Sequence, residues 1–325
     1  MTSLKSWPCA ALPHAELSAR TTMRVGGAAE WLLEPGTPEE LRKAVIAARE
    51  EGYTPRILGG GANLIIDDGV LPGVVITTDR IKRLFRPEPE GPSTVRDATE
   101  MAPRVAPAPR EEGLRFVAWA GVSMPKLVNA AAELGWSGVE GLAGVPGNVG
   151  GGIAMNAGGR WGEMWGVVER VLVVDERGEF QELERSACTP RYRNGGLGSR
   201  IVVSALLKFD LDDPRVVKER GRDFLLEKNR VQPVTAWSAG CVFKNPDKLA
   251  SAGRSAGKLI EECGLRGRTV GDAIVSPLHG NFIVNRGRAS AGDVFELIRI
   301  VREEVADRTG IALEMEAKVW RAETA

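Results

Sequence analysis

Residues 144–159, GVPGNVGGGIAMNAGG, hold seven glycines in sixteen positions, and residues 58–65, LGGGANLI, form a second glycine-rich segment. Glycine adopts positive φ and lets a ligand approach the main chain, so the N–H groups of both segments can surround a phosphate. Neither is a mononucleotide motif, because no G-x-x-x-x-G-K-[ST] is present and Leu64 stands where G-x-G-x-x-G requires glycine. Each segment alone could be a tight turn between strands. Two in one half of the chain favour a large diphosphate ligand.

The composition favours a small-molecule partner. The 325 residues include 43 basic and 43 acidic side chains, so no net charge attracts nucleic acid or an anionic membrane. The four cysteines form no C-x-x-C pair and only two histidines are present, so neither a disulfide framework nor a metal site is expected. The apolar runs are shorter than a membrane span, and the N-terminus lacks the apolar core of a signal peptide. We therefore expect a cytoplasmic protein.

Strands and helices follow one another in a pattern that predicts the α+β class. A helix is expected after Thr37, with Glu40 at the capping-box position, and Gly135 should end another at residues 123–134. From Arg170 the pattern predicts antiparallel strands at 170–175, 180–183 and 200–210. Further helices are expected after residue 213, at 256–263 and at 291–309. We predict two domains, residues 1–213 and 214–325.

The sequence predicts the structure of two further segments, a surface insertion and a strand. Residues 86–113 contain six prolines and many charges, which predicts a mobile surface insertion. Residues 311–320, IALEMEAKVW, alternate between apolar and polar side chains, which predicts one strand. In that strand Glu314 and Glu316 would share a face.

Eight segments match, in order, the motifs of one protein family: TTMRVGG (21–27), ILGGGANLI (57–65), GLAGVPGNVGG (141–151) with MNAG (155–158), YRN (192–194), AGCVFKNP (239–246), SAGKLIEECGL (255–265), NFIVN (281–285) and LEMEAKV (313–319). Together they resemble the UDP-N-acetylenolpyruvoylglucosamine reductases, flavoenzymes of bacterial cell-wall (peptidoglycan) precursor synthesis. The resemblance covers most of the chain. Departures from the family pattern are Asn148, Ala317 and the glycine that follows Asn194.

The resemblance implies a two-lobed FAD-binding domain of the PCMH/vanillyl-alcohol-oxidase type with a C-terminal α+β substrate-binding domain. It also implies a reaction in two halves. NADPH reduces FAD, and the reduced flavin then passes hydride to C3 of the enolpyruvyl group of UDP-N-acetylglucosamine enolpyruvate while an acid protonates C2. The product would be UDP-N-acetylmuramate. The protein is expected to act as a monomer, with no nucleic-acid or membrane partner.

The matching positions imply roles for individual residues. Arg193 would bind the substrate carboxylate and stabilise the charge that develops there, with Glu316 assisting. Cys241 stands where the family's acid is expected to be a serine, although a packing role is the commoner fate of a lone cysteine. Possible substrate contacts are Tyr192, Lys244 and Asn245, with ordinary turn residues as the alternative. The expected FAD-binding residues are Gly59, Gly60, Gly61, Ala62, Asn63, Leu64, Gly144, Pro146, Gly147, Asn148, Gly150 and Gly151.

Two other functions are compatible with the same fold. One is an FAD-dependent sugar or alcohol oxidoreductase; such enzymes usually carry a His or Cys attached to flavin, and both histidines here lie outside the glycine segments. The other is a catalytically silent protein that binds FAD or a UDP sugar. Observation of the flavin colour during addition of NADPH and then of substrate would distinguish them.

Overall fold

The computed structural model describes residues 6–87 and 113–322, so the predicted insertion at 86–113 lies almost wholly outside the described residues. The described chain folds into two compact units whose segments alternate along the sequence. The first unit contains residues 6–12, 31–60, 73–87 and 113–226, and the second contains 13–30, 61–72 and 227–322. The predicted domains, 1–213 and 214–325, stay a prediction.

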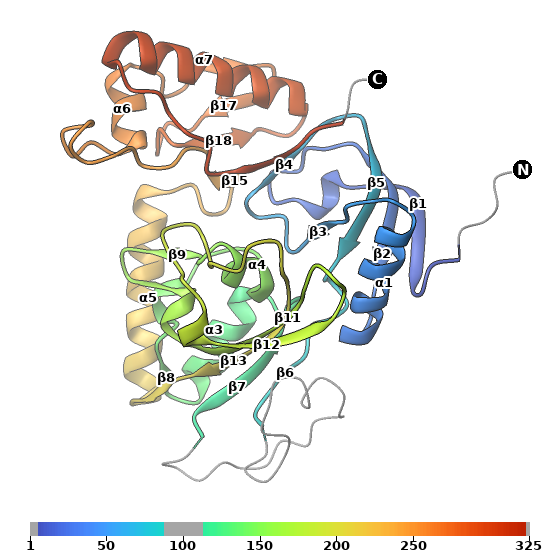
Figure 1. Cartoon of the computed structure of the whole chain (residues 1–325). Helices are drawn as coiled ribbons and strands as arrows, with labels where there is room; N and C mark the ends of the chain where they lie inside the picture. The colour runs from blue at the N-terminus through green and yellow to red at the C-terminus, as the bar shows by residue number, and fades with distance from the viewer. Residues whose placement is uncertain (1–5, 88–112, 323–325) are drawn as a thin grey trace, which may run out of the picture. The chain divides into compact units, whose positions relative to one another are not determined.

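The first unit is built on a five-stranded antiparallel sheet, which confirms the antiparallel pairing predicted after Arg170. Its strand order is β12 (Phe180–Glu184), β11 (Val168–Val174), β13 (Ile201–Lys208), β7 (Arg115–Trp119) and β6 (Leu84–Phe85). Helix α4 (Val149–Ala154) packs against β13 and β7, and α3 (Met124–Glu133) packs against α4 (Figure 1). Two short strand pairs belong to this unit: β8 (Trp136–Ser137) with β14 (Asp210–Leu211), and β9 (Gly158–Gly159) with β10 (Gly162–Glu163). The 18-residue helix α5 (Pro214–Val231) follows, and the unit boundary falls within it, after Leu226.

The division into two units cuts across three strands of a second, four-stranded sheet. Its order is β1 (Ala10–Glu16), β2 (Ala28–Glu34), β5 (Val70–Thr77) and β3 (Arg56–Leu58), and the boundary falls within β1, β2 and β5. Helix α1 (Pro38–Glu50) follows β2 and buries one apolar face, formed by Leu41, Ala44, Val45 and Ala48. β3 leads directly into the first glycine segment.

The second unit contains an antiparallel sheet and two helices. The strand order is β15 (Trp237–Cys241), β18 (Phe282–Asn285), β17 (Ala273–Val275) and β16 (Thr269–Val270). Helices α6 (Ala256–Glu262) and α7 (Ala291–Thr309) pack on one another, and α7 packs on β16 and β17 (Figure 1, orange and red). Strand β4 (Leu64–Ile66) pairs in parallel with β19 (Lys318–Trp320), so residues from both ends of the chain build this unit.

The predicted helix ends are confirmed where capping residues mark them. Ser290 forms a capping box with Asp293, and Gly310 ends α7 with φ of 69°. Thr37 caps α1 by accepting the Glu40 N–H at 3.1 Å. The Glu40 carboxylate, however, accepts the Gly36 N–H at 2.7 Å, so it does not complete the predicted capping box with Thr37.

The predicted strand over residues 311–320 is mostly wrong, because only Lys318–Trp320 form a strand. The preceding residues contribute one isolated bridge, between Met315 and Phe243. The N–H groups of Glu316 and Ala317 both donate to the Val242 carbonyl, at 2.8 and 3.2 Å. Two consecutive donors on one acceptor break the alternation of a strand. Glu314 is exposed whereas Glu316 is buried, so the two side chains do not share a face.

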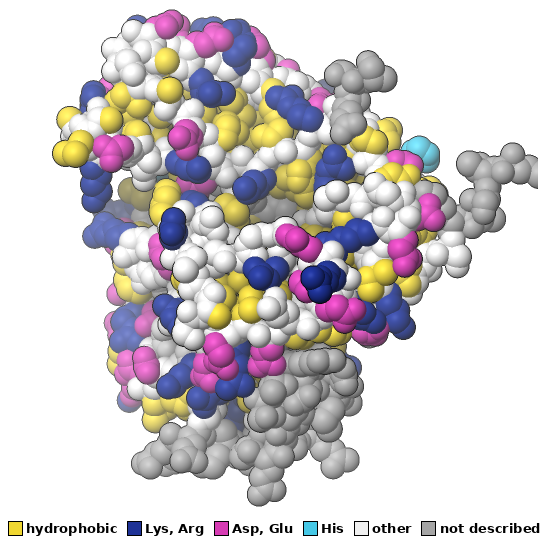
Figure 2. Space-filling model, in the orientation of Figure 1, with side chains coloured by type: hydrophobic (Ala, Val, Ile, Leu, Met, Phe, Trp, Pro, Cys, Tyr) yellow, Lys and Arg dark blue, Asp and Glu magenta, His cyan; other side chains and the backbone are white. Residues whose placement is uncertain are grey.

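The surface carries both signs of charge. Figure 2 shows Lys and Arg side chains interspersed with Asp and Glu over the visible face, without a large area of one sign. In the part of the chain that the structure describes, no helix is both long and apolar enough to cross a membrane.

Candidate active site

The two glycine segments approach one another through their backbones in the first unit. A Cβ atom on Gly60 would lie 2.8 Å from the Cα of Gly147, which leaves no room for any side chain. Gly147 has φ of 97° and its carbonyl accepts the Met124 N–H at 2.9 Å, which ties the second segment to the start of α3. One orientation of the Asn148 amide lets it donate to the Gly147 carbonyl at 3.2 Å and accept the Gly60 N–H at 3.3 Å. Glycine is thus required here by close approach as well as by conformation.

The rest of the first glycine segment lies in the second unit. The Gly61 carbonyl accepts the Thr22 N–H at 3.2 Å, and Thr22 Oγ1 donates to the Ser238 carbonyl at 2.7 Å. A Cβ on Gly61 would meet the Arg20 carbonyl oxygen at 2.2 Å. Within residues 6–87 and 113–322, no hydrogen bond has the N–H of Gly61 or Ala62 as its donor. This backbone suits a phosphate group of a ligand.

Tyr192 and Arg193 occupy the tip of a two-residue turn in the first unit. Arg191 and Asn194 close the turn by exchanging backbone hydrogen bonds of 2.7 and 3.0 Å. Arg193 has φ of 56°, a conformation that is strained for a residue with a side chain. Its Nη1 donates to the Gly158 carbonyl at 2.9 Å, and its guanidinium carbon lies 4.8 Å from the centre of the Tyr192 ring.

The glycine after Asn194, where the chain departs from the family pattern, has a local steric cause. The Gly195 N–H donates to the Ala154 carbonyl at 2.8 Å, which draws the turn onto the end of α4. A Cβ at Gly195 would then lie 2.2 Å from the Ile153 carbonyl oxygen. A serine therefore does not fit at this position.

Cys241 ends β15 in the second unit and is half-buried. It pairs with Phe282 after a register shift, and Gly240 before it has φ of 73°. Asn281 holds the next two residues: its backbone carbonyl accepts the Val242 N–H at 2.9 Å, and its side-chain amide bonds both the N–H and the carbonyl of Phe243, at 2.9 and 2.8 Å. All four cysteines of the chain are thiols.

Asn281 is itself fixed by the residue two places before it. The Asn281 N–H donates to Nδ1 of His279 at 3.1 Å, which requires that nitrogen to be unprotonated. Burial of the ring, and secondarily the charge of Arg266, lower the pKa of His279. The His279 ring, which holds Asn281 and through it Phe243, is therefore neutral near pH 7.

The two glutamates of the C-terminal motif have different surroundings. Glu316 is only 8% exposed, whereas the Glu314 side chain is 76% exposed and forms an ion pair of 3.2 Å with Lys244. The Glu316 N–H bonds the carbonyl of Val242, the residue after Cys241, and its own carbonyl accepts the Asn63 amide at 3.2 Å. The second unit thus brings Cys241, Glu316 and the end of the first glycine segment together.

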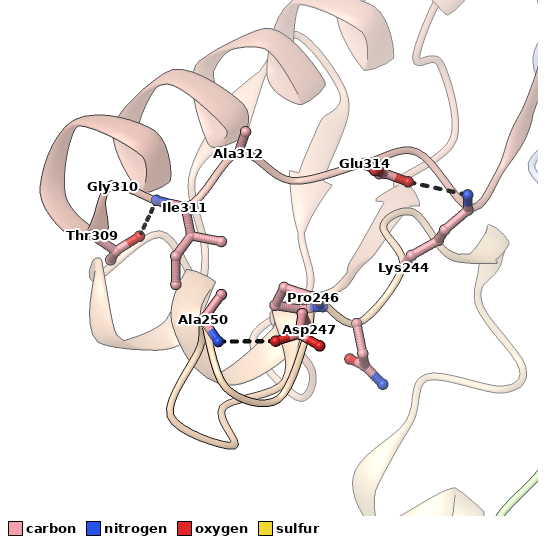
Figure 3. A pocket seen from close by; sticks show the side chains of 10 residues that line it. Lys244, Pro246, Asp247, Ala250, Thr309, Gly310, Ile311, Ala312 and Glu314 are labelled. Atoms are coloured by element: carbon pink, nitrogen blue, oxygen red, sulfur yellow. Dashed lines mark hydrogen bonds and ion pairs between the residues drawn. The ribbon is translucent and has the colours of Figure 1, made fainter.

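Lys244 and Asn245 line a cavity of about 520 Å³ at the C-terminal end of α7 (Figure 3). The Lys244 ammonium points to Glu314, and the side-chain amide oxygen of Asn245 accepts the Ala256 N–H at 3.1 Å, at the start of α6. Asn245 therefore has a structural function in addition to any contact with substrate. The sequence motifs contain Thr22, Asn156 and Asn281, but nothing in the sequence marked them as site residues.

Among the described residues, no group of three or more His, Cys, Asp and Glu could hold a metal ion. Comparisons with known proteins identify other groups that the site could bind. Residues 29–184 match the family model of an FAD binding domain, and residues 232–320 match that of the UDP-N-acetylenolpyruvoylglucosamine reductase C-terminal domain. These matches, with the structural likeness below, confirm the predicted fold class.

Several relatives are similar over nearly the whole chain. A UDP-N-acetylenolpyruvoylglucosamine reductase from Deinococcus radiodurans is 38% identical and covers 96% of both chains. One from Moorella thermoacetica is 37% identical and covers 95% of this chain and 93% of its own. The crystal structure of the enzyme from Thermus caldophilus superposes with a TM-score of 0.73 at 36% identity, over 96% of this chain and 98% of that one.

Proposed function

We propose that this chain, which belongs to the UDP-N-acetylenolpyruvoylglucosamine reductase family, reduces the enolpyruvyl group of UDP-N-acetylglucosamine enolpyruvate with NADPH. The product would be UDP-N-acetylmuramate, a precursor of peptidoglycan. The observation that carries the proposal is the grouping of Cys241 and Glu316 beside the end of a glycine segment, on a chain with an FAD binding domain. We further propose that the protein acts in the cytoplasm as a monomer, without a membrane or nucleic-acid partner.

The two glycine segments fit FAD. They offer close-packed backbone with positive φ at Gly61, Gly144 and Gly147, as a pyrophosphate requires. Bound FAD would accept hydride from NADPH and supply it to C3 of the enolpyruvyl group. The residues that would hold FAD are Gly59, Gly60, Gly61, Ala62, Asn63, Leu64, Gly144, Pro146, Gly147, Asn148, Gly150 and Gly151.

The chain's own side chains would bind and protonate the substrate. Arg193 would engage the carboxylate bidentately, and its fixed charge would stabilise the negative charge that grows there during hydride addition. Glu316 would assist at the same carboxylate. The Cys241 thiol would donate its proton to C2, because a neutral thiol is a far stronger acid than a serine hydroxyl. Tyr192, Lys244 and Asn245 would contact the remainder of the substrate.

Absorbance of the bound flavin tests the proposal in two steps. NADPH, added without oxygen, should bleach the flavin, and UDP-N-acetylglucosamine enolpyruvate should restore the colour with formation of UDP-N-acetylmuramate. If the colour is restored instead by the aldehyde or ketone that corresponds to a simple sugar or alcohol, the protein is an oxidoreductase of another class. Bleaching with no recovery on any acceptor would indicate a protein that binds flavin but has lost the second half-reaction.

Gly60→Ala should weaken FAD binding by about tenfold or more. The added methyl group must displace the Gly147 backbone, from which it would lie 2.8 Å, and overpacking of that kind costs roughly 1–3 kcal/mol. Gly159→Ala is the matched control, because nothing lies within 4 Å of its Cβ position. Titration of each apoprotein with FAD, followed by fluorescence, measures the two dissociation constants. Equal constants would show that the contact between the segments does not shape the cofactor site.

A further inference from the structure

We infer that Asn156 and Glu163 are positioning residues that hold Arg193 in the orientation needed for the substrate carboxylate. The inference rests on the proposed function, because Arg193 is the group that would bind the carboxylate. It concerns a set of linked contacts in the first unit: hydrogen bonds from Asn156 to Glu163 and to Arg191, the strand pairing of Glu163 with Gly158, and the hydrogen bond from Arg193 to Gly158.

Asn156 is the centre of the set. Its side chain is 3% exposed, and φ of 44° places its backbone in the left-handed region, which asparagine tolerates better than most residues. Its amide nitrogen donates to Glu163 Oε2 at 2.8 Å and to the Arg191 carbonyl at 3.3 Å. Its amide oxygen accepts the Trp165 N–H at 3.2 Å. Both polar ends of a buried amide are therefore used, and a smaller side chain would leave these partners unsatisfied.

Glu163 connects Asn156 to the backbone that holds the guanidinium. In the β9–β10 pair Glu163 lies directly opposite Gly158. The Gly158 carbonyl accepts Arg193 Nη1 at 2.9 Å. Anchoring of the Glu163 carboxylate by Asn156 therefore fixes the short hairpin that offers this carbonyl.

Asn156 also contacts the start of the turn that carries Arg193. Arg191, whose carbonyl accepts the Asn156 amide, closes the turn by its two backbone bonds with Asn194. One side chain thus fixes both the start of the turn and the hairpin that contacts its tip. The strained φ of 56° at Arg193 persists only if its surroundings hold it. A bidentate contact also depends on the direction of the guanidinium, and a misplacement of about 1 Å can cost on the order of 100-fold in rate.

Asn156→Gly tests the inference while preserving the backbone, because glycine accepts positive φ. The KM for the enolpyruvyl substrate should rise and flavin re-oxidation should slow, together on the order of 10- to 100-fold. Flavin reduction by NADPH should stay within about twofold. Affinity for UDP-N-acetylglucosamine, which lacks the carboxylate, should likewise be unchanged. Equal losses for both ligands would indicate general loosening of the structure and would overturn the inference.

Arg193→Lys in both backgrounds tests whether Asn156 acts through Arg193. The lysine should be strongly deleterious in the native chain but add little to Asn156→Gly, since the guanidinium is already misplaced there. Additive losses would contradict the inference. If Arg193→Lys alone leaves re-oxidation at the native rate, the proposed role of Arg193 fails first, and that outcome is distinguishable from the others.

A reversed pair of side chains provides a test that does not depend on the glycine variant folding. Asn156→Asp should repel Glu163 and lose re-oxidation rate, because the donor of the 2.8 Å bond becomes an acceptor. Glu163→Gln, added to it, supplies a donor from the other side and should recover at least about a third of the loss. Absence of recovery in a folded double variant would show that this hydrogen bond does not position Arg193.

Discussion

Cys241→Ala is expected to leave flavin reduction by NADPH intact and to slow re-oxidation by the enolpyruvyl substrate on the order of 100- to 10,000-fold, the usual contribution of a general acid. The thiol ends β15 after a register shift, in a turn fixed by the bonds of Asn281 to Phe243. Such a fixed position suits a proton donor, whereas methyl replacement leaves nothing to donate. Stopped-flow absorbance of the flavin measures the two half-reactions separately.

Cys241→Ser is the matched variant, and it should retain appreciable re-oxidation because a hydroxyl can occupy the same position. A thiol ordinarily ionises near pH 8.5, and the thiolate cannot donate a proton. The re-oxidation rate of the native protein should therefore fall at mildly alkaline pH, and this decrease should be absent in the serine variant. Peroxide should inactivate the native protein by oxidising the thiol but spare the serine variant. Re-oxidation of the alanine variant at the native rate would assign Cys241 to packing alone.

Glu316→Gln should slow re-oxidation by the substrate on the order of 100-fold, with reduction by NADPH preserved. Glu316 is only 8% exposed, and its backbone N–H bonds the carbonyl of Val242, the residue after Cys241. Glu314→Gln is the control, because it makes the same change from carboxylate to amide at an exposed side chain that pairs with Lys244. Its re-oxidation rate should stay within about twofold of the native rate. The same stopped-flow measurement compares them, and equal effects would mean that Glu316 is not the functional glutamate.

The sequence predicts those parts of the fold that local chemistry determines. Ser290 and Gly310 mark the ends of α7 because a hydroxyl and a left-handed glycine satisfy the open backbone groups at the two helix ends. The C-terminal motif shows the limit of this reasoning. Its apolar alternation predicts a strand, but the paired donation by Glu316 and Ala317 to Val242 depends on a segment about seventy residues earlier in the chain.

In the candidate site, too, the sequence indicates some residues and not others. The motifs lead us to propose Arg193, Cys241 and Glu316, because side chains with particular chemistry stand at particular positions in them. The supports of these residues are side-chain bonds to distant backbone, such as Thr22 to Ser238 and Asn63 to Glu316. A propensity or a periodicity carries no information about such bonds, since they arise only when the segments meet.

The parallel pairing of β4 with β19 has a consequence for the order in which the protein matures. β4 directly follows the first glycine segment, and the Lys318 N–H bonds the Asn63 carbonyl at 2.9 Å. Because β19 lies far after β4 in the sequence, β4 remains without its partner strand until residues 318–320 have been synthesised. A chain that ends before Lys318 lacks that strand. If the first glycine segment holds the flavin as proposed, we expect uptake of the flavin to follow the synthesis of residues 318–320.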